Sequence, residues 1–275
     1  RGLVGSEMCI RDSHRLSRPG RPYEACLEDG CYHGADLLYR LGKKIYDYEP
    51  DFYTPKKLSR ITIDDIRKRF NIDGAEVPDP AVRALLLKDL GIKLLKLYNG
   101  SFMELLKISG CRLRGTIDKP GLIDLLKIFR AYEDPVEKKS FLLVKFLIAR
   151  KLYQVCDAEN MEIPVDNHLT RVALRTGLVK VRGRLWNYIK SFQPVSYTDD
   201  ILIRYVVRIA YKEVSRKSTK PVSYIDDILW KLGRTTCLRD EIPKCSVCLF
   251  KDFCIARKDK RYMVKEHNYY NTWYY

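Results

Sequence analysis

The chain of 275 residues contains no hydrophobic run long enough to cross a membrane. Its longest apolar stretch, residues 141–149, already includes Lys145. Strict alternation of polar and apolar residues is rare, there is no internal repeat, and an export signal is absent. These absences predict an all-α protein without a membrane partner. Because nine cysteines occur without an export signal, we also expect an intracellular, reducing location, the cytoplasm.

The first residues, RGLVGSEMCIRDS, look like a translated sequencing adaptor. They have neither the apolar core nor the small-residue cleavage site of a signal peptide, so residues 1–13, with Cys9, are set apart from the expected fold. The composition and periodicity of the rest predict a domain order: an N-terminal extension (14–76), a helical bundle (77–165), a second helical lobe with a cysteine loop (166–255) and a basic, aromatic tail (256–275).

Apolar residues at helical spacing predict most of the secondary structure. Expected helices cover 36–48, 62–72, 80–100, 101–109, 121–132, 141–155, 167–178, 184–192, 199–214 and 222–234. Ser101 and Glu104 have the spacing of a capping box. The segment 141–155 is apolar nearly all round, which predicts a central, buried helix.

The charge balance is strongly basic. There are 51 Lys and Arg against 35 Asp and Glu, a net charge of +16. A chain of this size and charge attracts polyanions, of which nucleic acid is the commonest. The alternative is a solvated surface that is basic without a specific partner.

Four cysteines near the C-terminus form the most informative pattern. Cys237, Cys245, Cys248 and Cys254 are spaced C-x7-C-x2-C-x5-C. A structural zinc site usually uses two short cysteine pairs, whereas this stretch has one pair flanked by single cysteines. One compact loop that presents four thiolates favours a 4Fe-4S cluster. Zinc is the alternative, and four unligated cysteines are a third reading.

The other cysteines have no such pattern. Cys26 and Cys31, with His33 nearby, could be part of a second metal site, but a fourth ligand is missing. We expect Cys26, Cys31, Cys111 and Cys156 to be buried or surface thiols.

A second motif lies at residues 164–179, PVDNHLTRVALRTGLV. Asp166 directly precedes the expected helix, so by itself it is an ordinary N-cap. A carboxylate in this position accepts backbone N–H bonds and stays ionised.

Together, the V-D-x-H-x-x-R-V-x-x-R-T pattern and the cysteine loop resemble the endonuclease III group of the helix-hairpin-helix (HhH-GPD) DNA glycosylase superfamily, whose C-terminal loop holds a 4Fe-4S cluster. Residues 230–237, WKLGRTTC, are similar to the helix that leads into the first cluster cysteine. The similarity extends from about residue 80 to 255, and the first cysteine gap differs by one residue. It implies two helical lobes and a base-excision repair enzyme that acts on damaged duplex DNA in the nucleoid.

The resemblance also implies the catalytic residues. Asp166 falls at the family's catalytic aspartate, where a fixed carboxylate stabilises the positive charge that develops on the sugar. Lys139 falls at the family's Schiff-base lysine, which gives some members AP-lyase activity, and its neighbour Lys138 would lower its pKa. Two solvated lysines that open a helix are the alternative. Pro135 and Glu137 replace hairpin glycines, which weakens the expected grip on a DNA phosphate.

The remaining predictions concern nucleic-acid contacts. We expect DNA backbone contacts from Lys138, Ser140, Lys244, Lys251, Lys258 and Arg261. Two rivals to the glycosylase remain open: a non-catalytic nucleic-acid-binding protein that keeps fold and cluster, and an enzyme that acts on RNA or a modified nucleoside. The Tyr-rich end has two readings, stacking on bases or docking on the first domain. Neither the lesion nor the oligomeric state follows from the residues.

Overall fold

The computed structural model describes residues 22–269 and 272–274. The adaptor-like segment 1–13, with Cys9, lies outside the described residues. The chain divides into two compact units: residues up to Asn160 together with Trp273 and Tyr274, and Met161 to Thr272. The N-terminal extension thus belongs to the first unit. In the described part of the chain, no helix has the length and apolar character that a membrane span requires.

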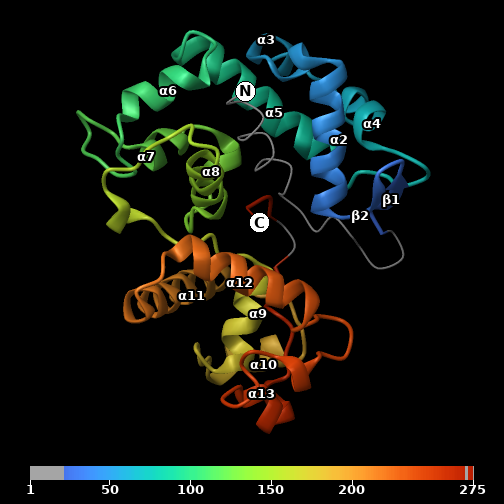
Figure 1. The fold of residues 1–275 in the computed structure, drawn as a ribbon, viewed down its shortest axis with the longest axis vertical. Helices are drawn as coiled ribbons and strands as arrows, with labels where there is room; N and C mark the ends of the chain where they lie inside the picture. The colour runs from blue at the N-terminus through green and yellow to red at the C-terminus, as the bar shows by residue number, and fades with distance from the viewer. Residues whose placement is uncertain (1–21, 270–271, 275) are drawn as a thin grey trace. The chain divides into compact units, whose positions relative to one another are not determined.

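The first unit is mainly helical (Figure 1). Its helices are α2 (Ala35–Tyr48), α3 (Pro55–Leu58), α4 (Ile63–Phe70), α5 (Pro80–Leu97), α6 (Phe102–Ser109), α7 (Leu122–Leu126) and α8 (Lys138–Ala149), with short 3-10 turns η1 (Pro50–Tyr53), η2 (Arg130–Tyr132) and η3 (Ala158–Asn160). Helix α5 packs against α3 and α4. The contact with α3 requires a glycine, because a Cβ at Gly91 would lie 2.5 Å from the backbone nitrogen of Ser59.

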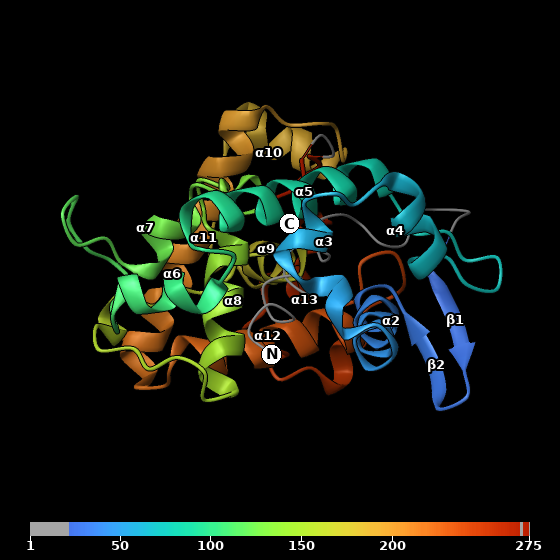
Figure 2. The ribbon, with the colours of Figure 1, turned by 90° about the horizontal axis from the view of Figure 1, so that it is seen from above.

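One element departs from the all-α expectation. A two-stranded antiparallel hairpin, β1 (Glu24–Leu27) and β2 (Gly30–His33), lies beside α2 (Figure 2). Cys26 and Cys31 are directly opposite each other in its register and form a disulfide. His33 pairs through Nδ1 with Glu24 at 2.8 Å. The expectation of two thiols, and the alternative of a metal site with His33, were therefore wrong, because adjacent strands bring the two sulfurs into bonding range.

The expected helix 121–132 is shorter than predicted. Helix α7 ends at Leu126 because two side chains of α5 bind the backbone that follows it. Asp89 accepts the N–H of Arg130 at 2.9 Å, and the ammonium of Lys93 donates to the carbonyl oxygen of Ile128 at 2.7 Å. These hydrogen bonds take the place of the backbone hydrogen bonds that would extend α7, so the chain forms the 3-10 turn η2.

The expected capping box at Ser101 is also absent. The side chain of Ser101 makes no cap bond, and Glu104 pairs with Lys107 at 3.2 Å. A capping box instead begins α4, where Thr62 and Asp65 bond each other's backbone N–H groups. The two segments have similar spacing, so only the backbone that enters each helix distinguishes them.

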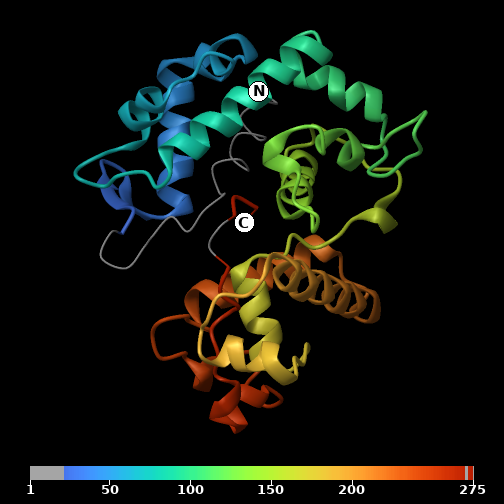
Figure 3. The ribbon, with the colours of Figure 1, turned by 180° about the vertical axis from the view of Figure 1, so that it is seen from behind.

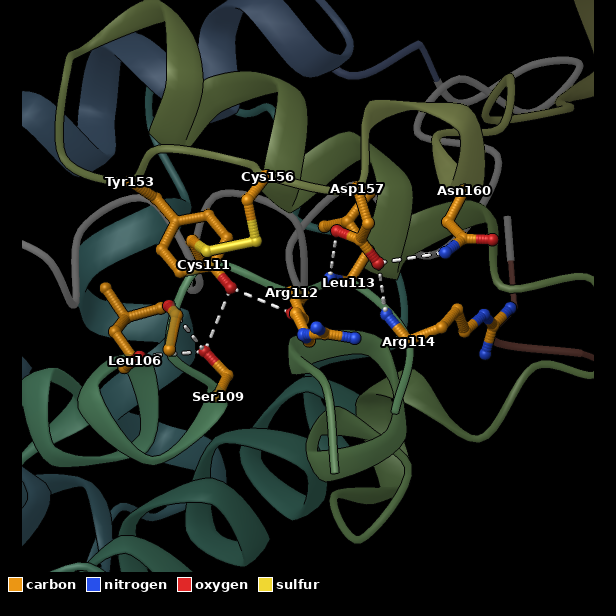
Figure 4. The surroundings of a disulfide bond; sticks show 11 residues. Leu106, Ser109, Cys111, Arg112, Leu113, Arg114, Tyr153, Cys156, Asp157 and Asn160 are labelled. Atoms are coloured by element: carbon orange, nitrogen blue, oxygen red, sulfur yellow. Dashed lines mark hydrogen bonds between the residues drawn. A yellow bond between two sulfur atoms is a disulfide. The ribbon is translucent and has the colours of Figure 1, made fainter. Parts of the chain in front are cut away.

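A second disulfide joins Cys111 to Cys156, which were also expected as thiols (Figure 4). Beside it, the hydroxyl of Tyr153 donates to the carbonyl oxygen of Arg112 at 2.9 Å and contacts Ser109 Oγ at 3.0 Å. The bond therefore closes a loop of the first unit that contains α7 and α8.

The second unit is helical and centred on α9 (Asn167–Thr176). Its other helices are α10 (Gly183–Lys190), α11 (Tyr197–Ser218), α12 (Val222–Thr235) and α13 (Ile255–Lys258), with 3-10 turns η4 (Cys245–Val247) and η5 (Lys260–Tyr262). Helix α9 packs against α11, α12 and α13, and Figure 3 shows it beside the orange α11 and α12. The approach of α12 is close, since a Cβ at Gly233 would lie 2.7 Å from His168 Cβ.

Candidate functional site

Asp166 begins the central helix of the second unit. Its Oδ1 accepts the backbone N–H of Leu169 at 2.9 Å, and its own backbone is extended. The predicted N-cap is confirmed. Leu169 and Thr170 are fully buried, so α9 anchors a half-buried carboxylate to a rigid core. The arrangement fixes the position of a carboxylate at the N-terminus of α9.

The histidine of the motif, His168, is held in its neutral form. Burial lowers the pKa of His168, and the Arg171 guanidinium lowers it further, against the opposing effect of Asp166. Arg171 Nη2 lies 3.0 Å from His168 Nδ1. Because a guanidinium only donates, Nδ1 accepts, and the ring proton is on Nε2. A neutral imidazole therefore follows the Asp166 cap.

Two arginines on α9 bind the cysteine loop to this helix. Arg171 donates to the carbonyl oxygens of Gly233 at 2.7 Å and Cys237 at 3.1 Å. Arg175 donates from Nη1 to the carbonyl oxygen of Leu238 at 2.7 Å. Burying a guanidinium group costs free energy unless its N–H groups are hydrogen-bonded. These hydrogen bonds therefore fix the position of the backbone that leads from α12 into the cysteine loop.

The same arginines hold the start of the tail. Arg175 Nε donates to the carbonyl oxygen of Val264 at 2.6 Å. Arg171 Nη1 forms a fully buried ion pair with Glu266 at 3.0 Å, and Arg239 bonds the other oxygen of Glu266. The motif positions were recognised in the sequence, but this role was missed. Its signal was two arginines one helical turn apart among the buried positions of an amphipathic helix.

The four loop cysteines are unpaired and partly exposed. Arg175 Nη1 donates to Cys237 Sγ at 3.3 Å, and the backbone N–H of Phe250 donates to Cys248 Sγ at 3.4 Å. Burial raises the pKa of Cys248, and the charges of the other cysteines raise it further. N–H donors are therefore directed at two of the four sulfurs. This donor set fits a thiolate-bound cluster.

The side chains of the loop are not arranged around one metal-ion position. In the described residues, no group of three or more His, Cys, Asp or Glu side chains is arranged to hold one ion. A structural zinc ion would need four ligand atoms at about 2.0–2.3 Å from one point.

The three polar residues that open α8 are buried in the first unit. Lys139 and Ser140 are fully buried and Lys138 is 4% exposed. The ammonium of Lys139 donates to the carbonyl oxygen of Trp273. Contact of these side chains with a nucleic acid would therefore require the surrounding chain to open.

The hairpin before α8 carries an internal carboxylate. Asp134, 1% exposed, accepts the N–H groups of Val136 and Lys138, each at 3.0 Å. These amides lie at the turn where the resembling family binds a phosphate. Because Asp134 already bonds them, this turn is not open to an external anion.

Glu137 adopts the left-handed conformation, with φ 59°, at the position of a family glycine. It is 3% exposed and forms ion pairs with Arg114 and with Lys127, the latter at 3.0 Å. Burial raises the pKa of Glu137, but the bonds from Arg114 and Lys127 outweigh it and hold the pKa below its usual value. The charge of Glu137 is therefore turned inward and neutralised by Arg114 and Lys127, and the weakened grip on a phosphate stays a prediction.

The remaining expected contacts are in the second unit. Lys244, Lys251, Lys258 and Arg261 are all exposed, and Arg261 pairs with Asp259 at 2.6 Å. Asp166 and the cysteine loop are brought together by α9, whereas Lys139 belongs to the first unit. The expected cleft between Lys139 and Asp166 stays a prediction.

Comparison with known proteins identifies the fold. No protein-family model matches the sequence, and no curated protein matches it. Among solved structures, the chain is similar to an endonuclease III trapped as a covalent intermediate with DNA, in an estranged-adenine complex. The identity is 15% and the TM-score 0.55, over 94% of this chain and 86% of that chain. The likeness confirms the predicted all-α fold and shows that it resembles the fold of endonuclease III.

Proposed function

We propose that this protein is a DNA glycosylase that removes a damaged base from duplex DNA. The observation that carries the proposal is Asp166, a carboxylate fixed by the cap of α9 within the fold of endonuclease III. The net charge of +16 supports a polyanionic substrate. The solved relative is itself a complex with DNA.

The chemistry assigns one role to Asp166. Cleavage of an N-glycosidic bond builds positive charge on the sugar, and a rigid anion stabilises that charge more than it stabilises the ground state. The carboxylate can also accept a proton from an attacking water or amine. Since the target base is stacked in a duplex, the enzyme must first flip it out.

We further propose a structural 4Fe-4S cluster on Cys237, Cys245, Cys248 and Cys254, with zinc as the alternative. When bound, either cofactor would cross-link the four cysteines of the loop. Arg175 would orient the loop through its bonds to Cys237 Sγ and the Leu238 carbonyl oxygen. Iron, sulfide and zinc analysis of the purified protein distinguishes the two cofactors.

A lyase step through Lys139 is the finer part of the proposal. Lys139 holds the position of the family's nucleophilic lysine and opens the buried helix α8. Its neutral amine would attack C1′ of the sugar, expel the base and form a Schiff base that permits strand cleavage. Borohydride trapping on a duplex with an abasic site, with Lys139→Ala as control, tests this step.

The main test is Asp166→Asn, which keeps the shape and the cap of α9 because Asn caps as well as Asp. Removing the charge should slow base release by about 100-fold or more, as loss of comparable electrostatic stabilisation does in other enzymes. DNA affinity should change little. Asp65→Asn is the matched control, since Asp65 also accepts a helix-start N–H, at 3.0 Å, but lies in the first unit.

Each rival function has its own outcome. A non-catalytic DNA-binding protein would show tight, salt-dependent binding and no base release in either the natural chain or Asp166→Asn. It is favoured by the closed hairpin turn, where Asp134 occupies the amides. An enzyme for RNA or modified nucleosides would act on single-stranded RNA and leave lesion-bearing duplexes intact.

A further inference from the structure

The C-terminal segment Trp273–Tyr274 makes contacts that the proposed function does not use. Trp273 is grouped with the first unit, although the residues before it belong to the second. Its carbonyl oxygen accepts the ammonium of Lys139, 134 positions earlier in the chain. Its indole Nε1 donates to the carbonyl oxygen of Arg130 at 3.1 Å. Main chain and side chain thus hold this residue at two separate points of the unit.

The contact has a chemical consequence for Lys139. A lysine attacks a sugar only as a neutral amine whose lone pair faces the carbon. In the structure Lys139 Nζ donates to the Trp273 carbonyl oxygen, so the amine is engaged by this segment and is not presented to an external carbon. Because Lys139 is fully buried, a DNA substrate cannot reach it while the segment is in place.

We propose that Trp273–Tyr274 is an autoinhibitory cap on Lys139, which DNA must displace before the lysine can react. The inhibitory role of the cap rests on the proposed function, whereas the contacts that form the cap do not depend on it. Trp273 anchors the cap through Arg130, and the Trp273 carbonyl oxygen blocks the amine. Each of the two hydrogen bonds changes the equilibrium constant between the capped and the open state by up to about tenfold. Binding of a long DNA can therefore displace the cap.

The test compares the chemical reactivity of individual lysines in the full-length protein. Brief reductive methylation, read by mass spectrometry of peptides, reports how often each amine is exposed. Trp273→Ala removes the indole anchor, and Trp273→Phe keeps a ring but removes the N–H that bonds Arg130. Trp230→Ala is the matched control, since Trp230 is 38% exposed and stacks on Arg234 in the second unit.

We expect Trp273→Ala to raise the methylation rate of Lys139 by about tenfold or more, with a smaller rise in Trp273→Phe. Lys138, buried next to it, serves as the internal reference and should change little. Trp230→Ala should leave both rates unaltered. If the rate of Lys139 is the same in both Trp273 variants as in the natural chain, the cap is refuted.

A parallel assay separates this inference from the proposed lyase activity. Borohydride trapping on abasic duplex DNA should proceed faster in Trp273→Ala. Faster methylation with no trapped adduct in any variant would keep the cap and remove the lyase. Equal trapping and equal methylation would keep the lyase and remove the cap. If every lysine reacts faster in Trp273→Ala, that variant has lost its fold, and Trp273→Phe decides.

Discussion

The disulfide between Cys111 and Cys156 gives a stability prediction that can be worked out from the chain alone. The two residues are 45 positions apart, and a cross-link of that span removes unfolded-chain entropy worth about 4 kcal/mol at about 25 °C. Replacing both cysteines by serine should therefore lower the free energy of unfolding of the first unit by up to that amount. Cys26 and Cys31 are 5 positions apart, and the same relation gives about 2 kcal/mol.

The native geometry around the bond should survive its loss. The backbone N–H of Cys156 donates to the carbonyl oxygen of Cys111 at 2.8 Å. Asp157 accepts the N–H groups of Leu113 at 2.7 Å and Arg114 at 3.1 Å, as Figure 4 shows. Because these bonds hold the two segments together in the folded state, the double serine variant should keep its fold and its DNA affinity.

The assay is guanidinium unfolding followed by circular dichroism under non-reducing conditions. Hydrogen exchange of peptides from α6 and α8 reports the first unit separately from the second. The Cys26→Ser/Cys31→Ser variant is the matched control with the shorter loop. A loss below about 1 kcal/mol at the long bridge, or one no larger than at the short bridge, would refute the loop-entropy reasoning.

Three further predictions concern single residues. Asp134→Ala should destabilise the first unit by about 1–2 kcal/mol in thermal unfolding, because two buried amides lose their acceptor; an unchanged melting temperature would contradict this. The pKa of Glu137 is held below its usual value, so its stabilising contribution is complete above about pH 4.5 and is lost as the pH falls through the lower, folded-state pKa. Glu137→Gln should flatten this part of the stability profile, and an identical profile would rule the contribution out. Cys248→Ser should give a colourless protein with an unstable second unit, whereas a well-folded, active and colourless variant would show that the proposed cluster is dispensable.

Local patterns in the sequence determined most of the helices. Apolar residues at helical spacing located α5 and α9 within a few residues, and Asp166 at the start of α9 is the cap that its residue type predicted. The spacing of the four cysteines predicted a loop that holds a 4Fe-4S cluster; the structure shows that these cysteines form no disulfide, and the cluster stays a prediction. These features depend on neighbours in the chain, so the residues themselves carry the information.

Tertiary contacts decided the rest. Helix α7 ends where Asp89 of α5 binds the backbone of Arg130, and the Cys111–Cys156 bond joins segments with no shared local pattern. The inward turn of Glu137 depends on Arg114 lying opposite it, and the cap on Lys139 depends on Trp273 at the far end of the chain. Each of these contacts joins residues that are far apart in the chain, and it stabilises the fold only after the helices have packed. The spacing of neighbouring residues therefore does not predict it.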